Sequence, residues 1–242
     1  MSSLWPPSLS RILSFLKPFP KVVSEGIELL LPSRCIACNT LDPPFVQPMF
    51  CQQCWESIFH PTPLSLLDSN MIPYQAFSCG SYDNLLYKLI VRAKFHADPL
   101  ALPPLLRLMD FSLSQMVGEP IHMITSVPPS VKRLRKRGLD LPGYLARKIS
   151  KKKRVSYFPK LLTRIHETPS QTSLSRTSRV KNVDGVFVCH DKKVKDQHVL
   201  VIDDVFTTGA TALATSRVLI ENGALQVTFL AACRALLDKN ES

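Results

Sequence analysis

Apolar residues alternate between two patterns from about residue 74 to the end of the chain. Short apolar runs predict strands at 121–127, 185–190, 199–205 and 226–237, and residues 75–82 are interpreted as a strand or part of a hairpin. The run at 199–205 is continuous and rich in β-branched residues, which is typical of a parallel sheet buried on both faces. Apolar residues at helical spacing predict helices at 84–95, 102–117 and 209–224. Asn222-Gly223 provides a C-terminal stop for the last of these helices. Strands that alternate with helices predict an α/β domain over residues 74–242, with a parallel sheet flanked by helices.

The pattern ahead of this domain divides the chain further. Residues 1–31 form a predicted N-terminal helical segment, residues 32–60 a small cysteine module, and residues 61–73 a linker with prolines and serines. No apolar run is long enough to cross a bilayer, which predicts no membrane insertion. The apolar patch at the N-terminus is interrupted by Pro6, Pro7, Pro18 and Pro20 and lacks a small-residue cleavage site. We therefore expect no signal peptide and a cytoplasmic protein.

Four of the seven cysteines form two C-x-x-C pairs, Cys35–Cys38 and Cys51–Cys54, separated by twelve residues. Two such pairs can place four thiolates tetrahedrally around one ion, and a reducing compartment favours Zn²⁺ over the alternative of two disulfides. Because four protein ligands close the site, the metal is expected to stabilise folding and to take no part in catalysis. Asn39, directly after the first pair, tolerates the left-handed backbone that such a turn often needs.

The strand predicted at 199–205 ends in two adjacent carboxylates, and a threonine-rich loop follows them. Ligands of open α/β sheets bind at the carboxyl ends of the strands. The loop leads into a helix N-terminus, whose N–H groups, hydroxyls and dipole suit a phosphate, while the carboxylates suit sugar hydroxyls or hydrated Mg²⁺. The alternative is a strand end followed by a helix-capping Asp-Thr turn. The predicted site for a phosphorylated sugar comprises Asp203, Asp204, Val205, Thr207, Thr208, Gly209, Ala210 and Thr211.

This stretch resembles the phosphoribosyl pyrophosphate (PRPP) motif of type I phosphoribosyltransferases: an apolar strand, an acidic pair, a spacer, Thr-Thr-Gly and Thr. By that resemblance Asp203 and Asp204 bind the ribose hydroxyls, residues 207–211 bind the 5′-phosphate, and Mg²⁺ accompanies PRPP. Together with the cysteine module, three further stretches resemble the ComF family of competence proteins, including its GntX-like relatives. They are AKFHAD at 93–98, VPPSVKRLRKRG at 127–138 and RIHETPSQTSLSRTSRVKNVDGVF at 164–187.

The resemblance to the ComF family covers residues 24–234. It implies a type I phosphoribosyltransferase-like domain behind a four-cysteine zinc module, and a role in natural transformation: the uptake and handling of single-stranded DNA in the cytoplasm. DNA-uptake or recombination proteins are the implied protein partners. One turn departs from the family, because Leu139, Asp140 and Leu141 stand where the family usually has Phe-Asn-Gln. The departure replaces two amides by a carboxylate and so changes the polar contacts of that turn.

Positive charge is concentrated in one part of the chain. Of a formal net charge of +11, residues 131–154 carry +10, from eleven Lys and Arg against Asp140. Such a segment suits a polyanion or a phosphorylated ligand, and the alternative is a solvated helix face. The candidate pyrophosphate-binding residues, which follow the strand at 121–127, are Pro128, Pro129, Ser130, Lys132, Arg133 and Arg137. The nucleic-acid candidates are Arg135, Lys136, Arg147, Lys148, Lys151, Lys152, Lys153 and Arg154.

No pattern in the chain identifies an acceptor base or a catalytic base. Three functions stay open: a ComF-like DNA-handling protein with a phosphoribosyl pocket, an active phosphoribosyltransferase of nucleotide metabolism, and a non-catalytic sensor of PRPP or a nucleotide. The absence of an evident base does not separate them, because phosphoribosyl transfer needs little acid–base machinery. Few aromatic residues interleave with the basic ones, so single-stranded DNA is expected to bind mainly by electrostatic attraction.

Overall fold

The protein is described from a computed structural model. The residues that the structure describes are 35, 38–40, 45–47, 50–58, 62–64, 74–80, 84–95, 98–116, 120–130, 134–135, 139–165 and 185–235. The helical segment predicted at 1–31 lies outside them. The chain divides into two compact units, Met1–Glu56 and Ser57–Ser242.

The first unit carries the cysteine module. Strands β1 (Phe45–Gln47) and β2 (Phe50–Cys51) form an antiparallel pair, and helix α3 (Gln52–Ile58) follows β2 directly. Cys51 ends β2, and Cys54 lies in the first turn of α3. The second C-x-x-C pair therefore lies where a strand passes into a helix.

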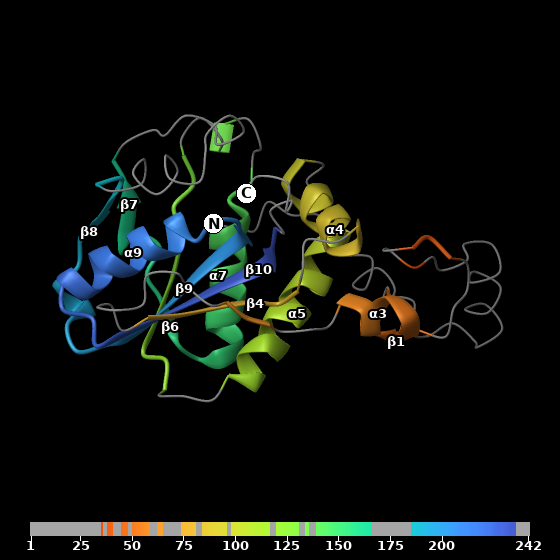
Figure 1. The fold of residues 1–242 in the computed structure, drawn as a ribbon, viewed down its shortest axis with the longest axis horizontal. Coiled ribbons are helices and arrows are strands. Elements are labelled where there is room, and N and C mark those ends of the chain that lie inside the picture. The colour runs from red at the N-terminus through yellow and green to blue at the C-terminus, as the bar shows by residue number, and fades with distance from the viewer. Residues whose placement is uncertain are drawn as a thin grey trace, which may run out of the picture. The chain divides into compact units, whose positions relative to one another are not determined.

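The second unit contains a six-stranded sheet, in which the strands from β4 to β6 run parallel (Figure 1). Their order is β3 (Thr62–Leu64), β4 (Tyr74–Ser78), β10 (Gln226–Arg234), β9 (His198–Phe206), β5 (Met123–Ser126) and β6 (Ser156–Tyr157). Strand β3 pairs antiparallel with β4 and falls inside the segment predicted as a linker, so part of that segment forms an edge strand. The predicted α/β class and the parallel sheet flanked by helices are confirmed.

Helices cover both faces of this sheet because the chain moves through it in two directions. After β5, helix α7 (Leu141–Lys153) connects to β6 at one edge; after β9, helix α9 (Ala210–Glu221) connects to β10 on the other side. Right-handed crossovers in opposite directions place their helices on opposite faces. Helix α5 (Leu102–Gln115) packs against α7, and helix α4 (Asn84–Phe95) packs against α5 (Figure 1). The predicted helices at 84–95, 102–117 and 209–224 are thus present.

A separate two-stranded antiparallel sheet is formed by β7 (Leu162–Arg164) and β8 (Phe187–Cys189). The strand predicted at 185–190 is present, but it pairs with β7 and not with the main sheet. One-turn 3-10 helices, η1 (Pro99–Ala101) and η3 (Lys192–Val194), precede α5 and β9 respectively. Arg164 is the last residue of β7.

The core lies along the two central strands. Residues 199–202 of β9 and 227–233 of β10 are buried, because helices cover the sheet on both sides. The rings of Phe206 and Phe229 meet edge-on at 6.3 Å. Within the described residues, no helix combines the length and the apolar character needed to span a membrane.

Candidate functional site

A pocket lies at the carboxyl ends of β5 and β9. These neighbouring strands pair through the register Ser126 to Ile202, but the chain leaves them in opposite directions. Their ends therefore form a topological switch point, where open α/β sheets bind their ligands. The backbone N–H of Val127 donates to the carbonyl of Ile202 over 2.9 Å, which fixes the loop after β5 beside the end of β9.

Most of the predicted phosphoribosyl-binding residues line this pocket. The lining includes Asp203, Asp204, Val205, Thr207 and Thr211. Thr208, Gly209 and Ala210 are not in the lining; Thr208 and Gly209 belong to the turn between β9 and α9, and Ala210 is the first residue of α9. The pocket wall therefore contains both the acidic strand end and two threonines of the predicted loop.

The turn into α9 leaves a helix N-terminus without a capping side chain. Gly209 is the N-cap, its φ of 83° lies in the left-handed region, and no side chain bonds to the cap. The Thr208 hydroxyl accepts a 3.4 Å hydrogen bond from the N–H of Ala210. Glycine adopts positive φ without steric cost, which allows the sharp turn here. An uncapped first turn presents N–H groups and the positive end of the helix dipole to a ligand.

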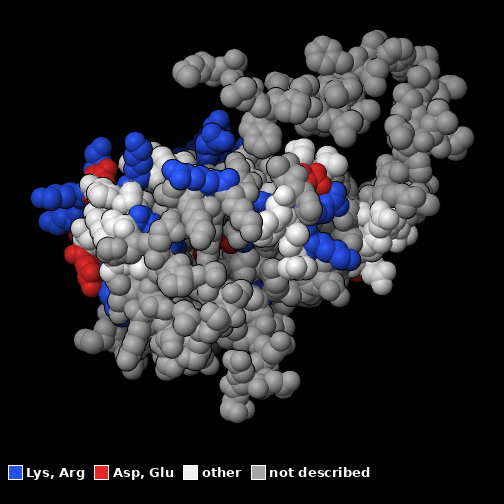
Figure 2. All heavy atoms as spheres, turned by 90° about the horizontal axis from the view of Figure 1, so that it is seen from above, with Lys and Arg blue, Asp and Glu red and all other residues white. Residues whose placement is uncertain are grey.

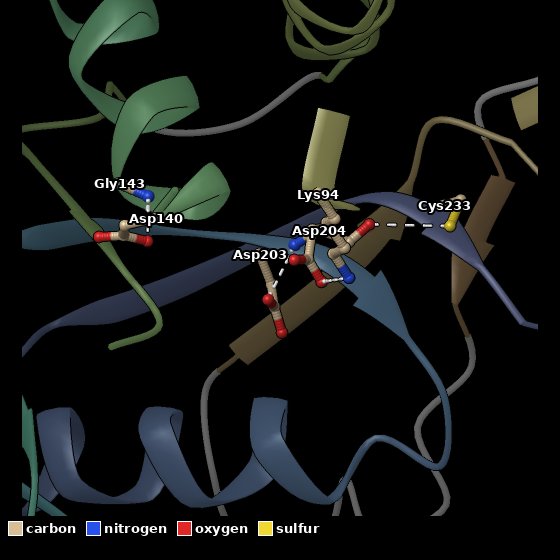
Figure 3. Close-up of polar contacts among 6 residues, drawn as sticks. All are labelled: Lys94, Asp140, Gly143, Asp203, Asp204 and Cys233. Atoms are coloured by element: carbon tan, nitrogen blue, oxygen red, sulfur yellow. Dashed lines mark hydrogen bonds and ion pairs between the residues drawn. The ribbon is translucent and has the colours of Figure 1, made fainter. Parts of the chain in front are cut away.

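The two carboxylates at the end of β9 differ in environment. Asp203 is 9% exposed, and its Oδ1 accepts the N–H of Asp204 over 2.8 Å. Burial, reinforced by the charge of Asp204, raises the pKa of Asp203 to about 8. The buried position of Asp203 therefore favours the protonated form of its carboxyl group. Lys94 of α4 reaches Asp204, with Nζ 2.8 Å from Oδ1 (Figure 3).

Two cations reach the pocket from elements distant in the sequence. Besides Lys94, Arg164 lines the pocket from the end of β7. Its guanidinium lies 4.8 Å from the ring centre of Phe187, and its Nε donates to the carbonyl of Pro128 at 3.5 Å. Neither residue was among the predicted binding residues. The sequence did hold a signal for both residues, because Lys94 and Arg164 fall in stretches that resemble the ComF family. The residues next to each in the sequence, however, give no sign that it belongs to a site.

Asp140, in the turn that departs from the family, also lines the pocket. It is the N-cap of α7, and its Oδ1 accepts the N–H of Gly143 over 3.0 Å. Burial raises the pKa of Asp140, and the charge of Asp204 adds to the effect. Figure 3 shows Asp140 at the start of α7, apart from the Lys94–Asp204 pair. The carboxylate thus has a structural role as a helix cap while it contributes to the pocket.

The predicted pyrophosphate-binding residues are only partly described. Pro128, Pro129 and Ser130 line the pocket, directly after β5. Lys132, Arg133 and Arg137 lie outside the residues that the structure describes. The loop after β5 therefore lines the pocket, and both its assignment to pyrophosphate and the roles of its basic side chains stay predictions.

The four cysteines of the module converge. One sulfur from each of Cys35, Cys38, Cys51 and Cys54 lies within 4.8 Å of the others. Asn39 has a φ of 64° and donates its N–H to the carbonyl of Cys35 over 2.8 Å, which confirms the predicted left-handed residue. A hydrogen bond from Thr40 lowers the pKa of Cys38 to about 6. Four close thiol groups are a donor set that fits a tetrahedral metal ion such as Zn²⁺.

The nucleic-acid candidates lie mostly on α7. Arg147, Lys148 and residues 151–154 are exposed, whereas Lys136 lies outside the described residues. Lys152 and Lys153 bind Asp110 of α5, at 2.6 and 2.9 Å. The positive charge of this surface is therefore partly neutralised at the C-terminal end of α7. Figure 2 shows a face on which basic side chains outnumber acidic ones.

No protein-family model matches the chain. The curated relatives include the DNA utilization protein YhgH of Escherichia coli K12, 31% identical over 113 residues, which are 47% of this chain and 49% of the relative. YhgH of Salmonella typhi is 28% identical over 77% of this chain and 84% of its own. The competence protein ComFC of Bacillus subtilis is 24% identical over 60% of this chain and 58% of its own. The match to the E. coli relative thus spans about half of that protein's length.

Solved phosphoribosyltransferases also align with parts of the chain. An adenine phosphoribosyltransferase from Trypanosoma brucei aligns over 75% of this chain and 90% of its own, with 14% identity and a TM-score of 0.41. The glutamine PRPP amidotransferase of B. subtilis aligns over 59% of this chain and 30% of its own, with 16% identity and a TM-score of 0.40. The YhgH and ComFC relatives support the resemblance that the motifs predict: this chain is similar to proteins of the ComF family.

Proposed function

We propose that the pocket at the ends of β5 and β9 binds a 5-phosphoribosyl ligand, either PRPP or a nucleotide, and that the protein uses it in the handling of single-stranded DNA. The observation that carries the ligand proposal is that one pocket is lined both by the acidic end of β9 and by two threonines from the loop and first turn of α9. Asp203 and Asp204 offer partners for the ribose hydroxyls, and Thr207 and Thr211 stand beside the uncapped start of α9.

The two halves of the pocket suit different chemical groups. A carboxylate accepts hydrogen bonds from vicinal hydroxyls, and a protonated Asp203 can also donate one. Phosphate is repelled by carboxylates and attracted by helix N-termini and hydroxyls, so the 5′-phosphate belongs at residues 207–211. Pro128 to Ser130 and Arg164 line the remaining wall, where a diphosphate would extend. In this arrangement Mg²⁺ accompanies PRPP on its diphosphate.

Calorimetric titration with PRPP tests the ligand proposal. Zinc-loaded protein is titrated with and without Mg²⁺, beside the Asp203→Asn/Asp204→Asn double variant. Asp196→Asn is the matched control, because Asp196 is exposed and its φ of 59° is tolerated by asparagine. We expect binding by wild type and control and its loss in the double variant. If wild type binds neither PRPP nor a nucleoside monophosphate, the proposal is wrong.

The DNA part of the proposal comes from the names of the relatives and from the surface of α7. Arg147, Lys148, Lys151 and Arg154 are exposed on or beside this helix, and no acidic side chain lies on it. Exposed basic side chains bind a single-stranded backbone with strong salt dependence. Cytoplasmic handling of incoming single strands would suit such a surface.

Fluorescence anisotropy with a labelled oligo-dT tests DNA binding across a salt series. Three to six phosphate contacts predict a slope of log affinity against log salt of about −2 to −4. A flat response would exclude the basic surface as a DNA site. Release of pyrophosphate from PRPP with candidate acceptor bases, followed in parallel, separates an active transferase from a binding protein.

A further inference from the structure

The floor of the pocket already contains a cation. Lys94 is 9% exposed, and the side chains of Lys94 and Asp204 are 11% and 15% exposed. Their charged groups are 2.8 Å apart (Figure 3). Burial of an ammonium group is costly unless a carboxylate compensates its charge. Because little water reaches this pair, the attraction between the two charges is only weakly screened.

The pair changes what the two aspartates offer to a metal ion. Mg²⁺ needs oxygen ligands at about 2.0–2.1 Å in near-ideal octahedral geometry, and it is usually held by one or two ionised carboxylates. The Oδ1 of Asp204 is engaged by Lys94, and the Oδ1 of Asp203 accepts a backbone N–H. Burial raises the pKa of Asp203, which makes that second carboxyl group a weaker ligand for a cation. The residues at the end of β9 therefore do not fit a free divalent cation.

We propose that the ammonium group of Lys94 occupies the cation position beside Asp204, so that the acidic pair takes sugar hydroxyls and excludes a divalent ion of its own. The statement that the acidic pair takes sugar hydroxyls rests on the proposed function. The exclusion of a divalent ion does not depend on it. Lys94 acts as a positioning residue: its ammonium group, 2.8 Å from the Oδ1 of Asp204, holds that carboxylate in place as a hydrogen-bond acceptor. A divalent ion would enter the pocket only on the phosphates of the ligand.

Titration with Mn²⁺ alone tests this exclusion, because Mn²⁺ prefers the same oxygen ligands and its free form is counted by electron paramagnetic resonance. The full zinc-loaded chain is compared as wild type, Asp204→Asn, Lys94→Met and Lys94→Met/Asp204→Asn. Lys88→Met is the matched control, since Lys88 is an exposed lysine of the same helix. Circular dichroism confirms that each variant is folded, and Lys94→Gln replaces Lys94→Met if the latter is not.

We expect Asp204→Asn to leave the Mn²⁺ binding of the otherwise wild-type chain unchanged. Lys94→Met should gain one Mn²⁺ site, with an affinity at least about tenfold above that of wild type, because the carboxylate of Asp204 then lacks its counter-ion. Asp204→Asn should remove the gained site, and Lys88→Met should not create one. The inference is overturned if Asp204→Asn weakens Mn²⁺ binding by the chain that retains Lys94, or if a folded Lys94 variant gains no site.

A second arm uses ribose 5-phosphate in buffers with and without Mg²⁺. Its affinity for wild type should change by less than about twofold when Mg²⁺ is added, because the acidic pair takes no metal. If the ligand binds only with Mg²⁺ and needs Asp204 for that dependence, the inference fails. If ribose 5-phosphate, PRPP and a nucleoside monophosphate all fail to bind while the Mn²⁺ results are as expected, the proposed function fails and the role of Lys94 stands.

Discussion

The carboxylate of Asp140 accepts a hydrogen bond from the backbone N–H of Gly143, 3.0 Å away, and so caps the N-terminus of α7. A Cβ added to Gly143 would collide with the Oδ2 and Cγ atoms of Asp140. In the turn that departs from the ComF family, the aspartate and the glycine three residues later therefore depend on each other: the aspartate caps the helix, and the glycine leaves room for its side chain. The same contact holds the Asp140 side chain at the wall of the pocket.

Gly143→Ala is expected to destabilise the second unit, although alanine normally favours a helix over glycine. Displacement of the Asp140 cap should lower the free energy of unfolding by about 1–2 kcal/mol, the typical cost of losing an N-cap. Urea denaturation of the wild type, both single variants and the Asp140→Ala/Gly143→Ala double variant measures the coupling. In the Asp140→Ala background the alanine should be neutral or stabilising, and equal costs in both backgrounds would contradict the contact.

Asp203→Asn should alter how stability depends on pH. Because burial raises the pKa of Asp203 to about 8, the folded protein keeps a proton that the unfolded chain releases near pH 4. The unfolded state then binds fewer protons, so wild-type stability falls as the pH rises from about 4 to 8 and levels off above it. Asparagine does not titrate, so Asp203→Asn does not lose stability in this way. The free energy of unfolding of Asp203→Asn relative to that of wild type should therefore increase from about pH 4 to 8.

Urea denaturation of Asp203→Asn and wild type at pH 5, 6, 7, 8 and 9 tests the linkage. Asp196→Asn, at an exposed aspartate, should run parallel to wild type. Parallel curves for Asp203→Asn and wild type would mean that the Asp203 carboxyl group titrates normally.

Arg154→Gly should stabilise the protein. Arg154 ends α7 in the left-handed conformation, with φ 59° and ψ 35°, and its side chain is exposed. A non-glycine residue in the left-handed region costs about 1–2 kcal/mol in the folded state. Glycine removes this cost, but it also gives the unfolded chain more conformational freedom, which offsets part of the gain in stability. A net gain of about 0.5–1 kcal/mol is expected in urea denaturation. Arg154→Ala, which removes the same charge without relieving the backbone, is the control and should give no gain.

Asp110→Asn should strengthen the binding of single-stranded DNA. Its carboxylate binds Lys152 and Lys153, and the variant releases both ammonium groups for phosphates. One or two added contacts would steepen the slope of log affinity against log salt by about 0.7–1.4. Anisotropy titrations of Asp110→Asn, Asp196→Asn and wild type measure the change. An unaltered slope would place the DNA contact away from the C-terminal end of α7.

Cys51→Ser should abolish retention of the metal that the cysteine cluster is proposed to hold. We expect one Zn²⁺ per wild-type chain by elemental analysis and markedly less in the variant, because one of four close thiolate ligands is lost. Acidification should release the ion, since protons compete with it for the thiolates. Cys189→Ser is the control, as Cys189 lies in β8 and outside the cluster. Equal zinc contents in both variants would contradict the site.

The long amphipathic helices were predictable because each presents many apolar residues at a regular spacing. The helix predicted at 84–95 agrees with the bounds of α4. Strands β3, β6 and β7 were not predicted, since two or three residues are too short to show an alternating pattern. The strand at 185–190 was predicted, but its partner was not, because the pattern of one strand does not specify which other strand it pairs with.

The sequence by itself determined the parts of the site that are continuous in the chain. Asp203, Asp204 and the threonine loop are neighbours, and the bond geometry of a strand that turns into a helix brings them to one place. Each cysteine pair is local in the same way, since its two members are only three positions apart in the sequence.

Only the tertiary structure decided which charges meet. Lys94 compensates Asp204, Arg164 contacts the carbonyl of Pro128, and Asp110 neutralises the two lysines of α7. These contacts join elements that the strand order and the direction of each crossover bring together, and no spacing along the chain encodes them. A charged side chain in a sequence reveals its sign, whereas its burial and its partner depend on how the elements pack.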